Sequence, residues 1–165
     1  MNAANARRLG GAALALALLG ACSTARGPAS VPTAIKVGQS WIVTRNSAAA
    51  EVLDTCSRDS PARQGGVLSG YWVPTIGQIA QLEARLPRLQ PTIADPASAD
   101  RQYVGILYRG KHAIYVNAFK PHHDDREVDP SVDAVRVCGG GSGFWGAVFN
   151  PDSGTFSEIA VNGAK

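Results

Sequence analysis

Hydrophobic residues recur at helical spacing most clearly over residues 76–86, which predicts one amphipathic helix. The apolar positions that share one face are Ile76, Ile79, Leu82 and Leu86. Thr75 precedes the run and Gln78 follows three positions later, so we expect a capping box at the start of this helix. Pro87 predicts its end, because proline cannot donate the next helical hydrogen bond.

After residue 101 the pattern changes to short runs rich in β-branched and aromatic residues, which are typical of strands. The expected strands cover residues 102–109, 112–119, 132–138, 144–150 and 155–161. Gly110 and Lys111 predict a two-residue hairpin turn, and residues 150–154 predict a tight turn in which Pro151 presets φ. Connections this short leave no room for a parallel crossover, so the pattern favours an antiparallel meander.

Alternation within the second of these strands predicts how it faces its neighbours. One face is expected to carry Ile114, Val116 and Ala118, and the other Tyr115, Asn117 and Phe119.

Upstream of the amphipathic helix, residues 39–45 have the composition of a strand, residues 46–53 predict a short helix, and residues 57–70 predict a loop. One main helix followed by consecutive strands indicates the α+β class. We expect that helix to pack on a four- to five-stranded antiparallel meander sheet, an arrangement similar to the cystatin-like fold.

Composition limits the class of protein. The chain has 165 residues, of which 45% are hydrophobic and 18% charged, with a formal net charge of +3, as expected for an ordinary globular protein. A charge this small does not indicate a nucleic-acid partner, and no apolar run reaches the ~20 residues of a membrane-spanning helix. We expect a single domain over residues 34–165.

The N-terminal residues 1–21 have the pattern of an export signal, with Arg7 and Arg8 ahead of an apolar stretch at residues 9–19. This stretch runs into Leu19-Gly20-Ala21-Cys22, which resembles the lipobox of bacterial lipoproteins. The resemblance implies that Cys22 becomes the first residue of the mature protein and carries a lipid. Ser23 follows, which in that family implies the outer membrane, with the domain expected to face the periplasm.

Residues 22–33 are expected to form the lipidated N-terminus and a flexible tether, since they contain few large apolar side chains. Cys56 and Cys138 remain as an even pair in an oxidising compartment, so we expect a disulfide between them. The alternative, a Cys138 nucleophile activated by a histidine, lacks any local motif.

Two segments carry aromatic residues that suit a partner-binding surface. Ser69-Gly70-Tyr71-Trp72 is similar to the Ser-Gly loop that bacterial lysozyme inhibitors insert into the muramidase active site. Phe144 and Trp145 end a glycine-rich stretch that begins at residue 139. We predict Tyr71, Trp72, Phe144 and Trp145 as partner contacts, with burial in the core as the alternative for the Tyr71 and Trp72 pair.

His122, His123 and Asp124 offer ligands suited to zinc or calcium, although their spacing matches no recognised metal motif. The alternative for this segment is a solvated loop. The string from Gly141 to Gly146 has the letters of a dinucleotide-binding motif, but an expected strand follows it where a helix is required.

These patterns predict a non-enzymatic lipoprotein, anchored in the outer membrane, that binds another protein of the envelope or an incoming one. An inhibitor of, or immunity protein against, a cell-wall hydrolase is one such role. The alternatives are a metal-assisted envelope hydrolase and a purely structural envelope lipoprotein. The region from Gln102 onward also resembles small exported bacterial proteins of unknown function, which implies export but no activity.

Overall fold

The computed structural model describes residues 39–121 and 128–164, and it shows an α+β fold built on one six-stranded mixed sheet. The strands are β1 (Ser40–Ile42), β2 (Leu68–Trp72), β3 (Asp100–Tyr108), β4 (Lys111–Phe119), β5 (Trp145–Asn150) and β6 (Thr155–Val161). The helices are α1 (Asn46–Leu53) and α2 (Ile76–Glu83), with short 3₁₀ turns η1 (Pro61–Arg63), η2 (Leu86–Leu89) and η3 (Gly141–Gly143). In this part of the chain no helix is long and apolar enough to cross a membrane.

The centre of the sheet is the β3–β4 hairpin, which pairs from Asp100 opposite Phe119 to Tyr108 opposite Lys111. Its turn consists of Arg109 and Gly110, with φ of 51° and 74°. The predicted turn, Gly110 and Lys111, is therefore wrong by one residue. Two central residues with positive φ give the twist that favours a tight hairpin, so Arg109 takes a conformation that is unusual for a side chain of its size.

Two strands share one edge of the sheet, which corrects the predicted antiparallel meander. β1 runs parallel to the first half of β3, with Trp41 opposite Gln102. β2 runs antiparallel to the second half, with Tyr71 opposite Ile106. The predicted loop over residues 57–70 therefore ends in part of a strand, because pairing with β3 compensates for the low strand propensity of Ser69 and Gly70.

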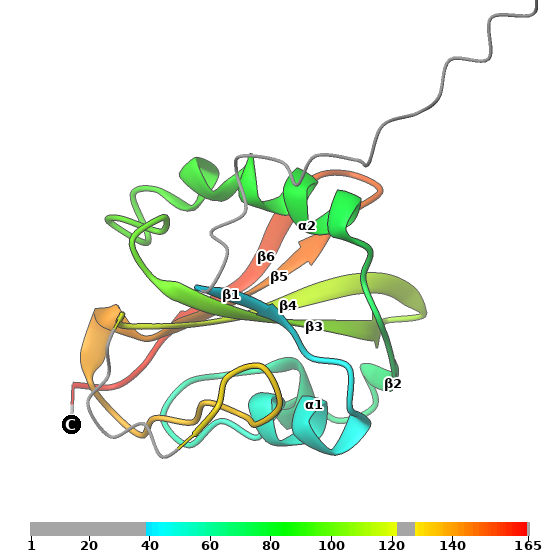
Figure 1. Cartoon of the computed structure of the whole chain (residues 1–165), viewed down its shortest axis with the longest axis horizontal. Coiled ribbons are helices and arrows are strands. Elements are labelled where there is room, and N and C mark those ends of the chain that lie inside the picture. Colours follow the sequence, from blue (N-terminus) through cyan, green and yellow to red (C-terminus); the bar gives the residue numbers. More distant parts are fainter. Residues whose placement is uncertain (1–38, 122–127, 165) are drawn as a thin grey trace, which may run out of the picture. The chain divides into compact units, whose positions relative to one another are not determined.

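The sheet is covered on both faces (Figure 1). α2 and η2 lie over one face, whereas α1 and the segments around residues 54–67 and 128–139 lie under the other. The predicted alternation of β4 is confirmed: Ile114, Val116 and Ala118 join the core under α2, and Tyr115 joins the core under α1. The expectation of one helix on one face is wrong, because both faces of β3 and β4 are apolar and each needs a cover.

The capping box at α2 is confirmed. The Gln78 backbone N–H donates to Thr75 Oγ1 at 3.3 Å, and the Thr75 N–H donates to Gln78 Oε1 at 2.9 Å. The helix ends at Glu83 rather than at Pro87, which lies in the first turn of η2, where proline is tolerated. Ile76 does not join the buried face.

The predicted strand at residues 132–138 is not formed. This segment instead lies under the sheet as an irregular chain, joined to the region after α1 by the Cys56–Cys138 disulfide. The disulfide predicted from the cysteine count is thus confirmed. It spans a separation of 82 residues and connects two segments that lie in the same covering layer.

The packing of α2 can be tested at Leu82 and Ile76, because the helical pattern predicts burial for both residues but the structure buries only one of them. Leu82 is fully buried, whereas Ile76 is 50% exposed. We expect Leu82→Ala to lower the free energy of unfolding by about 3 kcal/mol through lost burial and a residual cavity. Urea denaturation of the oxidised protein measures this loss. Ile76→Ala is the matched control, with an expected change under about 1 kcal/mol; equal losses would contradict the packing of α2.

Candidate functional site

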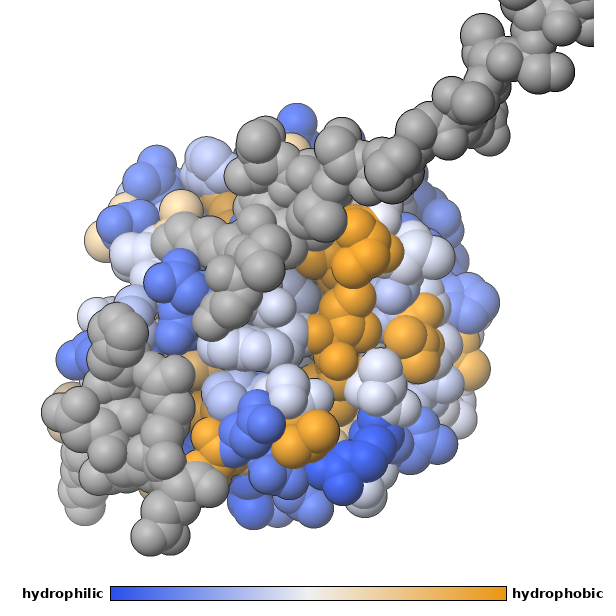
Figure 2. Space-filling view, in the orientation of Figure 1, coloured by the Kyte–Doolittle hydropathy of each residue, from blue (hydrophilic) through white to orange (hydrophobic). Residues whose placement is uncertain are grey.

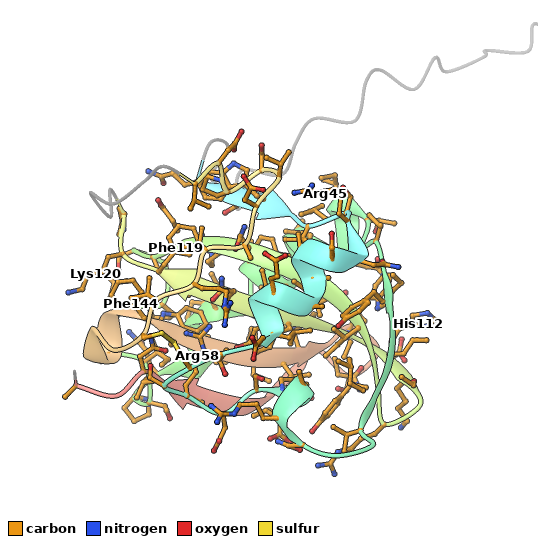
Figure 3. The ribbon with its side chains drawn as sticks, turned by 90° about the horizontal axis from the view of Figure 1, so that it is seen from below. Arg45, Arg58, His112, Phe119, Lys120 and Phe144 are labelled. Carbon is orange, nitrogen blue, oxygen red and sulfur yellow. A yellow bond between two sulfur atoms is a disulfide. The ribbon has the colours of Figure 1, made fainter. Side chains whose placement is uncertain are left out.

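The four aromatic residues predicted to contact a partner do not form one site. Tyr71 and Trp72 belong to β2 and lie beside the half of β3 that leads to the hairpin turn. Trp145 begins β5 opposite Ala118, near the other end of β4. Figure 3 shows the separation, with His112 at one end of the sheet and Lys120 and Phe144 at the opposite end.

Phe144 and Trp145 are only 3% and 1% exposed, so the prediction that they contact a partner directly is wrong for this structure. The glycine-rich segment folds over them instead. A Cβ on Gly140 would lie 2.5 Å from the Phe144 ring, and Gly140 itself has a φ of 80° that favours glycine. Lys120 covers another part of that ring, with its ammonium 5.9 Å from the ring centre.

Tyr71 and Trp72 are half-buried. The Trp72 indole N–H lies 3.0 Å from the Ile106 carbonyl oxygen, to which it donates, and its ring makes an edge contact with His112. Because Gly70 pairs with Leu107 of β3 and Ser69 lies at a bulge of the same strand, they do not form the projecting loop implied by the resemblance to lysozyme inhibitors. As part of β2, these four residues instead fix one end of the connection to α2.

That connection exposes two large hydrophobic side chains, Val73 at 53% and Ile76 at 50%. Figure 2 shows hydrophobic residues gathered over the segment that rises from β2 to α2. We call Trp72, Val73 and Ile76 the β2–α2 patch. The sequence pattern placed Ile76 on the apolar face of the helix, so sequence reasoning did not predict its exposure in this patch.

The backbone of the β2–α2 patch is held closely against the sheet. Pro74 is buried, and a Cβ on Gly105 of β3 would lie 2.9 Å from Pro74 Cδ and closer still to the Trp72 carbonyl oxygen. Only glycine therefore allows the connection to approach β3 this closely. Together with the capping box at Thr75, this contact fixes the segment that carries Val73 and Ile76.

A second feature is a guanidinium buried under the sheet. Arg58 is 8% exposed and follows α1 in the layer below the strands (Figure 3). Its Nε donates to the Tyr115 hydroxyl at 3.1 Å, Nη1 to Asn162 Oδ1 at 2.7 Å and Nη2 to Asn117 Oδ1 at 2.5 Å. Burial raises the pKa of Tyr115, so this hydroxyl stays neutral. Over the described residues no carboxylate pairs with Arg58.

Side-chain amides extend this network to the irregular segment beneath the sheet. Asn117 Nδ2 donates to Gln102 Oε1 and to the Val135 carbonyl oxygen. Gln102 Nε2 donates to the carbonyl oxygens of Pro130 and Asp133. These contacts satisfy backbone groups that a strand ladder would otherwise pair, which explains why residues 132–138 are ordered without forming a strand.

Asn162 likewise satisfies backbone groups at the start of the glycine-rich segment, since its Nδ2 donates to the carbonyl oxygens of Val137 and Gly139. Arg58 and the three amide side chains thus form a positioning network. No local motif marks these residues, because they come from four separate segments of the chain, so sequence reasoning missed them.

A buried ion pair lies on the other face of the sheet, between α2 and β3, at the same end as the Arg58 network. Arg101 and Glu83 are 0% and 3% exposed at their side chains, with Arg101 Nε 2.9 Å from Glu83 Oε1. Arg101 also donates to the Tyr103 hydroxyl and to the carbonyl oxygens of Pro96, Ala97 and Ala99. This ion pair joins the end of α2 to β3 and orders the irregular chain that leads into β3.

Several predicted site residues lie outside the described residues. They are Cys22, the predicted lipidation site, and His122, His123 and Asp124, the predicted zinc or calcium ligands. Elsewhere, across residues 39–121 and 128–164, no group of three side chains is placed to hold a metal ion. The metal site therefore stays a prediction.

No protein-family model, no curated protein and no solved structure matches this chain.

The positioning network makes Arg58 a sensitive position for stability. We expect Arg58→Met to lower the free energy of unfolding by about 3 kcal/mol, because it leaves the acceptors on Asn117 and Asn162 buried without this donor. Urea denaturation measures the loss. The control is Arg136→Met, since Arg136 pairs with Asp54 at the surface and should contribute less than about 1 kcal/mol. A loss at Arg58 no larger than that at Arg136 would contradict the role of the network.

Proposed function

We propose that this protein is a lipid-anchored protein of the bacterial envelope that binds another protein through the β2–α2 patch. The observation that carries the proposal is the pair of exposed side chains Val73 and Ile76 beside Trp72 on a rigid connection. Neighbouring exposed hydrophobic side chains of this kind are typical of interaction sites.

The rigidity of the patch supports binding of a folded partner. Trp72 is hydrogen-bonded to β3, Pro74 packs against Gly105, and Thr75 caps α2. Because the backbone is already ordered, association requires little further loss of conformational entropy. The half-buried Trp72 provides a large aromatic surface at the edge of the patch, and tryptophan is enriched among the residues that dominate interface energies.

The membrane anchor and the compartment are supported by two features of different kinds. Leu19-Gly20-Ala21-Cys22 resembles a lipobox, and the Cys56–Cys138 disulfide suits an oxidising compartment. We infer an outer-membrane protein whose domain faces the periplasm, with Ser23 after the lipidated cysteine favouring that membrane.

The anchor is tested by Cys22→Ser. In the unchanged chain we expect mass spectrometry of the mature N-terminus to find a lipid on Cys22, and membrane fractionation to recover the protein with the outer membrane. The variant should lose the lipid mass and leave that fraction, because the thiol that accepts the lipid is gone. Ser23→Ala is the control and should keep the lipid. Outer-membrane recovery of the Cys22→Ser variant without a lipid would contradict the anchor.

The β2–α2 patch is tested by photo-crosslinking in intact cells. A photoreactive amino acid at position 76 should give a single major adduct with another protein, because this side chain is exposed at the proposed interface. Position 51 is the matched control, since Glu51 is an exposed helical residue on the opposite covering layer.

The adduct formed from position 76 should disappear when Val73→Asp is added, because a charge in an apolar interface costs binding energy. Val73 is exposed, so this change should leave folding intact, which circular dichroism checks. Adducts of the same pattern from positions 76 and 51, or an adduct that survives Val73→Asp, would reject the patch as the interface.

A further inference from the structure

A pocket of about 250 Å³ lies at the hairpin end of the sheet, where the end of β4 meets the adjoining ends of β5 and β6. Ala113 and Val148 form its apolar base, and Lys111, Asn150 and Ser157 provide polar groups around it. The pocket is therefore large enough for a small polar group, with donors along its rim.

Two unusual backbone conformations border this pocket. Among the described residues, Arg109 and Glu158 are the two positions other than glycine with positive φ, at 51° and 50°. They also form an ion pair with each other, with Arg109 Nη2 3.6 Å from Glu158 Oε1. Backbone strain of this kind gathers at ligand-binding sites, where the surrounding structure holds it in place.

The strain at Glu158 coincides with a bulge in β6. The register against β5 shifts between Gly146 and Val148, which leaves an extra residue on β6. The bulge directs the Glu158 carboxylate toward Tyr108 and Gln64, whose side chains donate to it at 2.6 Å and 2.8 Å. These hydrogen bonds lower the pKa of Glu158, so the carboxylate is charged at neutral pH and keeps Arg109 in place.

The charge at the pocket is nevertheless positive. Arg109 and Lys111 line it, whereas Glu158 is the acidic side chain bound to Arg109. Lys111 is exposed and pairs with no carboxylate in the described part of the chain. An ammonium without a partner beside hydroxyl and amide groups provides the donors that oxyanions require.

We propose that this pocket binds an oxyanion group, a carboxylate or a phosphate, of a small polar ligand. Lys111 and Arg109 supply the charge, and Ser157 and Asn150 supply hydrogen bonds. Glu158 acts as a positioning residue through Arg109. The pocket and the β2–α2 patch share no residue, so this inference does not depend on the proposed protein partner.

The test is a titration of the whole chain, purified in a nonionic detergent, with acetate, inorganic phosphate or glycerol phosphate at constant ionic strength. Nuclear magnetic resonance spectra of the backbone amides report the site. We expect saturable shifts at residues 109–112 and 155–158 with at least one probe. Preference for acetate assigns a carboxylate ligand, preference for inorganic phosphate a free phosphate, and preference for glycerol phosphate a phosphate ester such as a lipid headgroup.

Lys111→Gln should weaken that binding about tenfold, because it removes one charge-assisted hydrogen bond. The change is on an exposed side chain, so the remaining spectrum should stay that of the folded protein. Lys120→Gln is the matched control at the opposite end of β4 and should leave binding unchanged. Shifts that fail to saturate with all three probes, or equal effects of the two variants, would overturn the proposal.

Discussion

The need to satisfy buried polar groups determines much of this structure. β3 and β4 are covered on both faces, yet they carry Arg101, Gln102 and Asn117 at one end, all of them buried. A buried polar group without a partner costs free energy, so each of these side chains must find hydrogen bonds. They find them in backbone groups of irregular segments above and below the sheet, which fixes those segments in place.

This constraint makes the two ends of the sheet different. At the end near Arg101, the Arg101–Glu83 ion pair and the Arg58 network hold the covering segments, and the aromatic rings of Phe144 and Trp145 are enclosed. At the hairpin end, the Glu158 carboxylate accepts hydrogen bonds from Tyr108 and Gln64, and a pocket lies between Lys111 and Ser157.

Both candidate surfaces lie toward the hairpin end. The β2–α2 patch begins at Trp72, whose ring contacts His112, and His112 also lines the pocket. β1 begins beside Arg101 of β3. Arg101 precedes Tyr108, at the hairpin end of β3, by seven residues, which corresponds to about 23 Å along an extended strand. A partner that reaches these surfaces would therefore approach the domain from the end opposite to the start of β1.

The amino-acid sequence by itself determined the features that depend on neighbours in the chain. The capping box of α2, the two faces of β4, strands β5 and β6 and the turn between them all follow from local patterns, and the even cysteine count indicated the disulfide. The tertiary structure alone decided the features that depend on distant partners. β2 forms because β3 is there to pair with it, and Arg58 is buried because Asn117 and Asn162 accept its hydrogen bonds. Ile76 is 50% exposed although Leu82, on the same predicted face of α2, is fully buried. Hydrophobic periodicity reports which side chains share a face, but only packing between distant segments decides which faces are covered.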